Sequence, residues 1–418
     1  MHHNAPPYHK ISTLLLTVLL PFALAHFISY VYRTINAVVY PELAQDLNLG
    51  ADSLGLMTSS YLLAFAIAQF PVGVTLDRFG PRKTQIPLLM IAAAGGLFFS
   101  QAQSLNELIL ARGLIGFGVA GSLMAAIKAC SLWLPPVRLP LATAVVLSVG
   151  GLGAMTSTTP AQIALEYTDW RHLFIILSAG TALIGLTIFT VVPEHPHKQN
   201  VQLGIMAQAV RQLYTSWSFW RLALYTLLPH ATYMAIQGLW MGPWLHDVAR
   251  LTRAEVANTL FFSTVAMVTG SLVFGWLTDY LRRFNIRPIL VCGTGIGLFL
   301  FFQLLMICNV SLSPIILAVG FSFFGTASTM NYAILAQSMP GHLTGRVSTS
   351  FNLLIFLFGF CIQWGLGGLI GFWERGQNGA YPTTAYSIAF GLILLLQIPG
   401  FLLWISFKPW QKENGDTP

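Results

Sequence analysis

The chain has 418 residues, of which 55% are hydrophobic and only 8% are charged, with a mean hydropathy of +0.68. Soluble domains average about 25% charged residues, so this composition excludes an ordinary water-soluble protein. The formal net charge of +7 reflects membrane topology better than a nucleic-acid-binding surface, and no nucleic-acid partner is expected.

Crossing the hydrocarbon core of a bilayer takes about 20 consecutive apolar residues in a helix. Runs of about this length lie at 12–40, 53–76, 84–103, 107–134, 141–165, 172–193, 219–244, 255–277, 288–308, 312–336, 345–371 and 383–407. The sequence therefore predicts an all-α membrane protein with twelve transmembrane helices.

Basic residues indicate how these helices are oriented. If the N-terminus is cytoplasmic, fourteen of the 21 Lys and Arg residues fall inside and four outside, while Arg33, Arg112 and Lys128 lie within spans. This is the positive-inside pattern. The first run resembles a signal peptide around Ala23–Ala25 but is too long, and its removal would invert the pattern. We expect a multi-pass protein of the cell inner membrane with both termini in the cytoplasm.

The first span carries a polar stripe. His26, Tyr30, Arg33, Asn36 and Tyr40 recur at spacings of three and four residues, which places them on one helix face. A charge at the bilayer centre costs about 2.5–3.5 kcal/mol or more, and it needs water, a partner or a ligand. Arg33 offers a planar donor fork that suits a carboxylate or phosphate. The alternative is that Arg33 snorkels to the outer interface.

The fourth span contains two further basic residues. Lys128 lies about two turns from the inner end, so binding an anion and snorkelling are both open. Arg112 precedes it by sixteen residues and faces another direction, at about 100° per residue. All fourteen acidic residues map to loops or span ends, so we expect no acidic partner at depth for these bases. An unpaired positive cavity would bind an anion.

A short motif occurs once in each half of the chain. Residues 73–83 combine glycine, aspartate and a basic cluster, and residues 275–283 repeat the pattern, with Asp279 in the place of Asp77. The glycine in each copy predicts close helix approach. Two homologous halves are typical of secondary transporters. We expect a six-helix bundle over 1–192, a cytoplasmic linker over 193–218, a second six-helix bundle over 219–410 and a cytoplasmic tail over 411–418.

The seventh span has a second polar and aromatic stripe at spacings of three and four residues. It is formed by His230, Tyr233, Gln237, Trp240 and Trp244. Imidazole titrates near neutrality, so His230 is a candidate for proton coupling. An ordinary hydrogen-bonded histidine is the alternative, and the tryptophans can mark the outer interface. Other candidates to complete a binding site are Ser322, Thr326, Asn331, Tyr332 and Asn352.

The ordered motifs resemble those of the major facilitator superfamily over essentially the whole chain. Residues 73–83 match its loop between spans two and three, residues 112–118 match its fourth-span motif, and residues 169–174 resemble its entry to span six. The resemblance implies two pseudo-symmetric six-helix halves. It also implies a cytoplasmic latch, in which Asp77 caps a neighbouring helix, and a structural role for Arg112. The implied gating and structural residues are Gly73, Asp77, Arg78, Gly80, Arg82, Arg112 and Asp279.

Within that superfamily the chain is similar to the anion:cation symporter branch. Arg33 is followed by Asn36, and Lys128 lies five residues before Trp133, as in that branch. The resemblance implies that these bases bind an anionic group. The branch's acidic residues are replaced by Tyr32 and Val119 or its neighbours, so its proton route is not carried over. The chain also has a general similarity to nitrate/nitrite porters, but their paired arginines are not matched in it.

Together these features predict a secondary transporter that carries a small organic anion, with a carboxylate as the expected class, and works by alternating access. It would be driven by a proton or cation gradient or by exchange, would work as a monomer, and would be no enzyme, with no metal and no cofactor. The predicted substrate-binding residues are Tyr30, Arg33, Asn36, Lys128, His230, Tyr233, Gln237, Trp240, Asn331 and Tyr332. Alternatives are an inorganic anion porter, a drug or metabolite efflux pump, and a non-transporting solute sensor.

Overall fold

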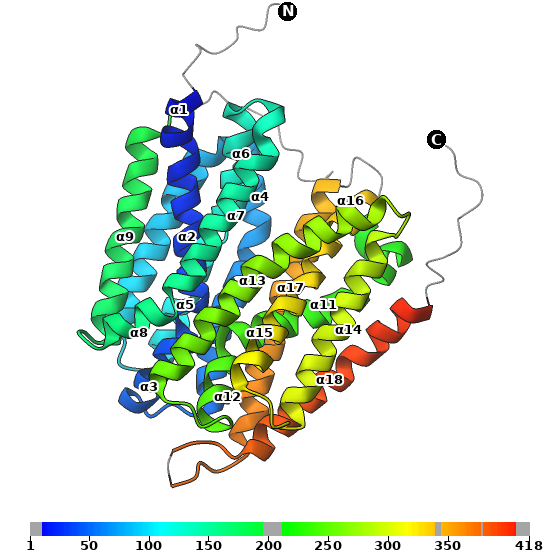
Figure 1. Ribbon diagram of the computed structural model, residues 1–418. Coiled ribbons are helices and arrows are strands. Elements are labelled where there is room, and N and C mark those ends of the chain that lie inside the picture. Colours follow the sequence, from blue (N-terminus) through cyan, green and yellow to red (C-terminus); the bar gives the residue numbers. More distant parts are fainter. Residues whose placement is uncertain (1–10, 195–210, 339–343, 378, 407–418) are drawn as a thin grey trace, which may run out of the picture. The chain divides into compact units, whose positions relative to one another are not determined.

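The computed structural model describes residues 11–194, 211–338, 344–377 and 379–406, and these ranges are helical without strands (Figure 1). The predicted tail at 411–418 and most of the predicted linker lie outside the described residues. The longer helices are α2 (Leu20–Thr34), α3 (Asn36–Asp46), α4 (Ala51–Gln101), α5 (Leu105–Val119), α6 (Ser122–Trp133), α7 (Leu139–Thr156), α9 (Trp170–Val191), α11 (Trp217–Ala235), α13 (Arg253–Arg282), α14 (Pro288–Ile307), α15 (Pro314–Gly325), α17 (Thr344–Gly371) and α18 (Thr383–Ser406).

Shorter helices extend or connect these elements. They are α1 (Ile11–Leu14), the π-helix η1 (Leu15–Leu19), η2 (Pro136–Arg138), α8 (Thr159–Leu165), the π-helix η3 (Ile236–Trp240), α12 (Met241–Asp247), the 3₁₀-helix η4 (Thr326–Met330) and α16 (Asn331–Ser338). Each of the twelve predicted runs falls on helix. Ten segments among the described residues are long and apolar enough to cross a membrane. One of them, α4, contains predicted spans two and three, and the less apolar α11–α12 segment is span seven.

Contacts divide the chain into two units, which we describe separately. One comprises residues 1–49 and 60–201, and the other comprises residues 50–59 and 202–418. The boundaries predicted from sequence, at 192 and 219, stay a prediction.

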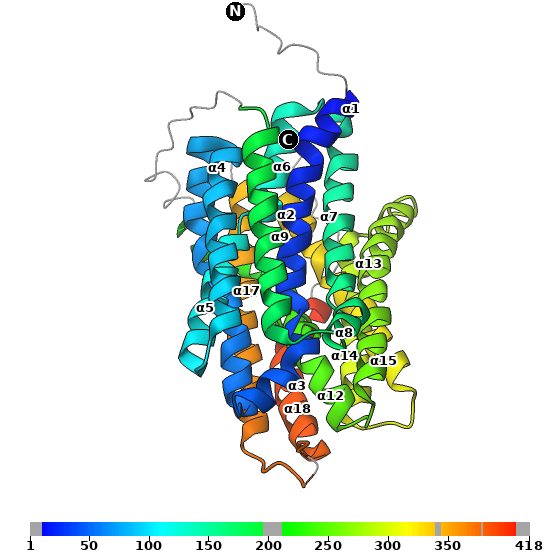
Figure 2. The same cartoon turned by 90° about the vertical axis from the view of Figure 1, so that its left-hand side faces the viewer.

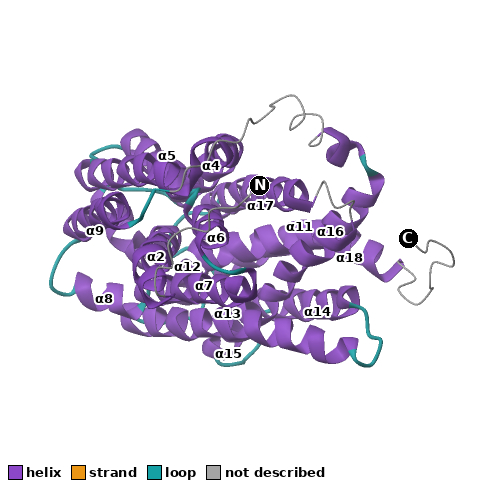
Figure 3. Ribbon diagram, turned by 90° about the horizontal axis from the view of Figure 1, so that it is seen from above, coloured by secondary structure: helices purple, strands orange, loops and turns teal. Residues whose placement is uncertain are grey.

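The first unit is organised around α2. This helix packs against α5, α6, α7 and α9, and its position beside α7 and α9 is visible in Figures 2 and 3. Its buried residues include Phe22, Ile28 and Tyr32. Side-chain caps fix the starts of two neighbouring helices: Ser104 accepts from the Glu107 N–H, and Asp169 accepts from the His172 N–H.

Helix α4 is two helices joined at a kink. Gly80 has φ 80° and ψ 172°, a conformation that is open essentially only to glycine. Pro81 follows, and its fixed φ suits the first turn of the second helix. The predicted break between spans two and three is therefore a single residue wide.

The second unit combines α11, α13, α14, α15, α17 and α18. Helix α15 packs between α13 and α14, while α11 packs against α17 and α18 (Figure 1). A capping box between Thr252 and Glu255 begins α13, and prolines begin α14 and α15.

Candidate functional site

Arg33 lies half-buried near the end of α2, among aromatic rings of the first unit. Its guanidinium carbon is 4.7 Å from the ring centroid of Tyr30 and 5.5 Å from that of Phe65. These distances permit cation–π attraction, which stabilises a guanidinium away from bulk water. Asn36 is fully buried about one turn further along the chain, at the start of α3. The structure thus divides the predicted first-span residues between α2, which carries His26, Tyr30 and Arg33, and α3, which carries Asn36 and Tyr40.

His26 belongs to the same face and is buried, with 3% of its surface exposed. Within the described ranges, neither of its ring nitrogens has a hydrogen-bond partner. Its ring meets the Tyr30 ring edge-on at 5.1 Å. A Cβ atom at Gly150 would lie 2.6 Å from the imidazole Cδ2, so glycine is needed here for α7 to pass this close.

Arg112 is completely buried in α5 and contacts α2. Its Nη1 donates to the carbonyl of Tyr32 at 2.9 Å, and its Cζ lies 5.2 Å from the Tyr61 ring centroid. This is a helix-to-helix contact of the kind implied for Arg112 by family resemblance.

Lys128 has an acidic neighbour, which corrects one expectation from the sequence. Its Nζ lies 3.2 Å from Oδ1 of Asp77, and the two side chains are 27% and 33% exposed. The prediction that the interior bases lack an acidic partner is therefore wrong for Lys128. Asp77 lies three residues before the kink at Gly80, at the end of the first segment of α4, and its contact with Lys128 joins α4 to α6. The described partner of Asp77 is this lysine and not the helix N-terminus that we expected.

Other residues of the 73–83 motif contact α9 and the segment that follows it. Arg82 Nη2 donates to the carbonyl of Phe189 at 2.6 Å, and Lys83 forms an ion pair with Glu194. This ion pair, at an exposed site, lowers the pKa of Glu194. Arg78 lies over the Phe79 ring at 5.2 Å. These contacts tie the turn around Gly80 to the end of α9.

The glycines of the two motif copies have room around them. Nothing lies within 4 Å of a Cβ atom built at Gly73 or Gly275. The close helix approach predicted at these two positions is therefore not seen in either unit. Asp279, the second-half counterpart of Asp77, is exposed at the end of α13.

A buried hydroxyl–amide cluster joins three helical segments of the second unit. Gln237 Oε1 accepts from Ser263 Oγ at 3.0 Å and from Ser322 Oγ at 2.6 Å, and the two hydroxyls lie 2.6 Å apart. Gln237 lies in the π-helix η3. Single π-turns are frequent at functional sites because they rotate the following side chains.

A second polar cluster is half-buried and contains His230 on α11, about two turns before Gln237, and Tyr332 on α16. His230 Nδ1 is 2.9 Å from Ser328 Oγ, and its ring meets those of Tyr233 and Tyr332 edge-on. Tyr332 donates to Asn352 Oδ1 at 2.7 Å. The structure thus brings together residues of predicted spans seven, ten and eleven. Ser263 and Ser328 were not predicted, because single serines in apolar spans give no distinctive pattern.

Two predicted binding residues are fully engaged in packing. Asn331 is buried, donates to Leu222 O at 2.8 Å and Thr226 Oγ1 at 2.6 Å, and accepts from Tyr225. Trp240 is 1% exposed and donates from Nε1 to Gln363 O at 2.9 Å. In this structure both hold helices of the second unit together.

A buried carboxylate at the end of α12 was missed from the sequence. Asp247 is 6% exposed, accepts from Tyr386 Oη at 2.6 Å and from the Tyr381 N–H at 3.1 Å, and lies 2.7 Å from His246 Nδ1. Its position directly after an apolar run was the available signal. Within the described ranges, no group of three or more His, Cys, Asp or Glu residues could hold a metal ion.

Comparison with known families identifies the class of protein. The model of the Major Facilitator Superfamily matches residues 22–363. The chain belongs to the Major Facilitator Superfamily. Members of this family are transporters and not enzymes, and the chain is accordingly a membrane transporter.

Several relatives of this transporter are named as transporters of organic anions. It is 23% identical to a probable sulfoacetate transporter, SauU, of Cupriavidus necator over 81% of this chain and 85% of that protein. It is also 23% identical to the hexuronate transporter of Escherichia coli K12 over 78% and 84%.

Solved structures share the fold of this transporter. A bacterial homologue of the lysosomal transporter Spinster, inward-facing and unoccupied, aligns with TM-score 0.73 at 15% identity over 97% of this chain and 100% of that chain. The nucleoside transporter NupG aligns with TM-score 0.75 at 13% identity over 94% and 100%. The predicted fold class is therefore confirmed.

Proposed function

We propose that this transporter carries a small organic anion, most simply a carboxylate, by alternating access across the inner membrane. Its termini are cytoplasmic in this proposal, as the positive-inside count indicates. The protein works as a monomer, and the energy comes from a proton or cation gradient or from exchange. The observation that carries the proposal is the half-buried guanidinium of Arg33 within a membrane span.

Arg33 is the proposed ligand of the anionic group. The rings of Tyr30 and Phe65 lie near its guanidinium carbon and help to hold the charged group within the span. A bidentate contact between arginine and carboxylate supplies two parallel hydrogen bonds as well as charge attraction. Tyr30 on α2 and Asn36 at the start of α3 would contact the same solute.

Side chains of the second unit would bind the uncharged part of the solute. His230, Tyr233, Gln237 and Tyr332 present imidazole, phenol and amide groups, which suit the hydroxyl groups of sugar acids. The sulfoacetate, hexuronate and galactonate transporters among the relatives support an anion of this kind. His230 remains the candidate for proton coupling.

Counterflow into liposomes tests the proposal. The purified protein is reconstituted and loaded with one solute at a time from a panel of sulfoacetate, hexuronates, galactonate, di- and tricarboxylates, phosphate and nitrate. We expect counterflow with at least one organic anion. Nitrate belongs in the panel because a nitrate/nitrite transporter of Nostoc punctiforme is 26% identical over 41% of this chain.

Variants at Arg33 show whether its positive charge is responsible for transport of the anion. Arg33→Ala should reduce counterflow about 100-fold, and Arg33→Lys about tenfold, because lysine keeps the charge but loses the fork. Arg138→Ala, at an exposed position in η2, is the matched control and should behave like the unmodified protein. Nitrate counterflow without organic-anion counterflow would overturn the proposed substrate class.

A further inference from the structure

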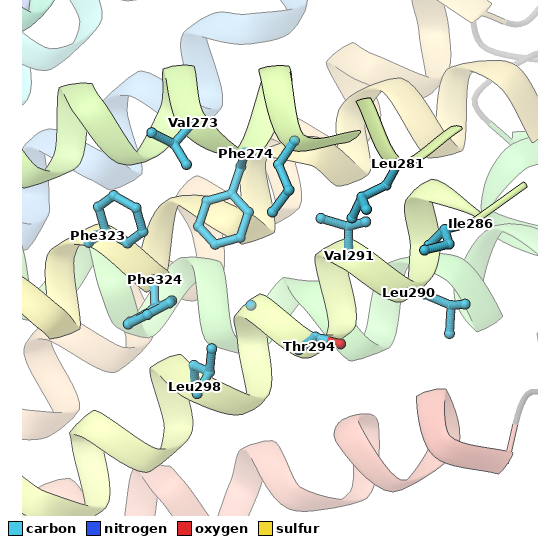
Figure 4. Close-up of a pocket in the computed structure, with 12 residues that line it drawn as sticks. Val273, Phe274, Leu281, Ile286, Leu290, Val291, Thr294, Leu298, Phe323 and Phe324 are labelled. Atoms are coloured by element: carbon cyan, nitrogen blue, oxygen red, sulfur yellow. The ribbon is translucent and has the colours of Figure 1, made fainter. Parts of the chain in front are cut away.

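An apolar groove runs along the second unit, away from the polar clusters described above. It encloses about 260 Å³ and is lined by α13, the turn after it, α14 and α15. Figure 4 shows Val273, Phe274 and Leu281 along one side, Leu290, Val291 and Leu298 along the other, and Phe323 and Phe324 at one end. Thr294 carries the only hydroxyl in the lining. Such a surface favours a hydrocarbon chain over water.

The groove is partly open to the surroundings. Val273 and Leu298 are each 39% exposed although they line it. It exists because α15 packs against both α13 and α14, while α13 and α14 touch each other less. At Gly295 the wall of the groove is closely packed, because a Cβ atom there would lie 2.4 Å from Ala327 Cβ and 2.9 Å from Phe274 Cε1.

A cluster of positive charge lies at one end of the groove. The turn between α13 and α14 is tight, because the N–H of Ile286 donates to the carbonyl of Leu281 at 3.2 Å, and both residues line the groove. Arg282, Arg283 and Arg287 belong to this turn or border it, and all three are exposed. Within the described ranges, neither Arg282 nor Arg283 forms an ion pair with a carboxylate.

Two further features affect the charge at this end. Asp279 lies three residues before Arg282, so residues 279–287 contain one acidic residue and three arginines. Helix α14 begins at Pro288 and has no side chain capping its N-terminus. The positive end of the helix dipole therefore adds to the arginine charge.

We propose that this groove binds an anionic phospholipid. One acyl chain lies between α13 and α14, and the phosphate of the headgroup lies at Arg282 and Arg283. The positive-inside count places this turn on the cytoplasmic side, where anionic headgroups attract basic clusters. We assign a lipid and not free phosphate, because a long apolar lining does not contribute to binding free phosphate.

Lipid binding to the full-length protein, purified and depleted of lipid in detergent, tests this assignment. Native mass spectrometry measures the affinity for dioleoyl phosphatidylglycerol, dioleoyl phosphatidylcholine and the short-chain dihexanoyl phosphatidylglycerol. We expect about tenfold tighter binding of dioleoyl phosphatidylglycerol than of the phosphatidylcholine with the same chains, from two arginines near one phosphate.

Variants of the arginines and of the groove lining separate the contribution of the lipid headgroup from that of the acyl chain. The double variant Arg282→Ala/Arg283→Ala should abolish the preference for phosphatidylglycerol, while Arg138→Ala/Arg211→Ala removes the same charge elsewhere and should keep it. Thr294→Phe fills the groove. It should weaken the binding of dioleoyl phosphatidylglycerol several-fold without changing the binding of the dihexanoyl lipid. Val273→Phe fills the opposite wall and replaces Thr294→Phe if that variant does not fold.

Several outcomes would contradict the assignment. Equal affinity for the two dioleoyl lipids would show that the arginines do not recognise the headgroup. Equal losses of the preference for phosphatidylglycerol in the two double variants would show a general effect of charge. Competition by millimolar inorganic phosphate as strong as that by lipid would mean a phosphate site and no lipid site.

Discussion

At the residue scale, Lys128 presents a choice between two roles. Its ion pair with Asp77 joins α4 to α6, which would suit a latch, whereas the family resemblance assigns it to the substrate. A double-mutant cycle separates the roles, because residues that act through each other have non-additive effects. We expect Lys128→Ala and Asp77→Asn to slow counterflow by similar factors, and the double variant to be little worse than either.

The Michaelis constant provides the control for that cycle. If Lys128 binds the substrate directly, Lys128→Ala would raise KM whether or not Asp77 is present. Additive losses together with a raised KM would therefore contradict the latch.

Asn331 is predicted to matter for stability more than for substrate affinity. Asn331→Ala would leave the buried hydroxyls of Tyr225 and Thr226 without this partner, and each unsatisfied buried group costs about 1–3 kcal/mol. We expect the melting temperature of the purified protein to fall by several degrees. Asn106→Ala, at an exposed position on α5, should leave it unchanged. An unchanged melting temperature for Asn331→Ala would contradict the packing described here.

Asp169 links stability to pH. The N–H of His172 donates to its carboxylate at 2.8 Å, which, with a smaller contribution from the imidazole of His172, lowers the pKa of Asp169. A lowered pKa in the folded state contributes stability that is present above the unfolded value of about 3.9 and is lost as pH falls through the folded value.

A pH series on Asp169→Asn measures this contribution. The variant keeps the cap acceptor but cannot titrate, so its melting temperature should fall less than that of the unmodified protein between pH 5 and about pH 3. The difference should be small because the aspartate side chain is 55% exposed. Parallel curves for the two proteins would show that the cap does not depend on charge.

At the element scale, the kink in α4 depends on one glycine. Gly80→Ala would force a side chain into a conformation that costs about 1–3 kcal/mol. We expect a lower melting temperature and weaker coupling between Asp77 and Lys128. Gly73→Ala, seven residues earlier in open space within the helix, is the matched control and should be neutral or slightly stabilising. Equal effects of the two substitutions would rule out a special role for the kink.

Hydropathy located the helices well because a bilayer imposes a minimum length and excludes unpaired backbone groups. It could not show how the elements are bent or joined. The π-turn at Gln237 and the 3₁₀-turn at Thr326–Met330 depend on packing inside the second unit. The break at Gly80, by contrast, was visible as a Gly-Pro pair within a charged motif.

At the scale of the whole molecule, the candidate site was only partly predictable. Arg33 and His230 could be selected because charge and imidazole are rare in spans. The partner of Lys128 could not be predicted, because Asp77 is 51 residues away and residue spacing does not show which faces of α4 and α6 meet. Asp247 was assigned to a span end, and its burial by Tyr386 depends on a contact across 139 residues.

In our proposal, Arg33 recognises the negative charge of the transported solute. The most direct measurement compares uptake of one transported carboxylate with that of its uncharged amide, in liposomes with the unmodified protein and with Arg33→Ala. We predict that the unmodified protein prefers the carboxylate about 100-fold and that the variant loses most of this preference. Uptake of the carboxylate by Arg33→Ala at the unmodified rate would contradict the account.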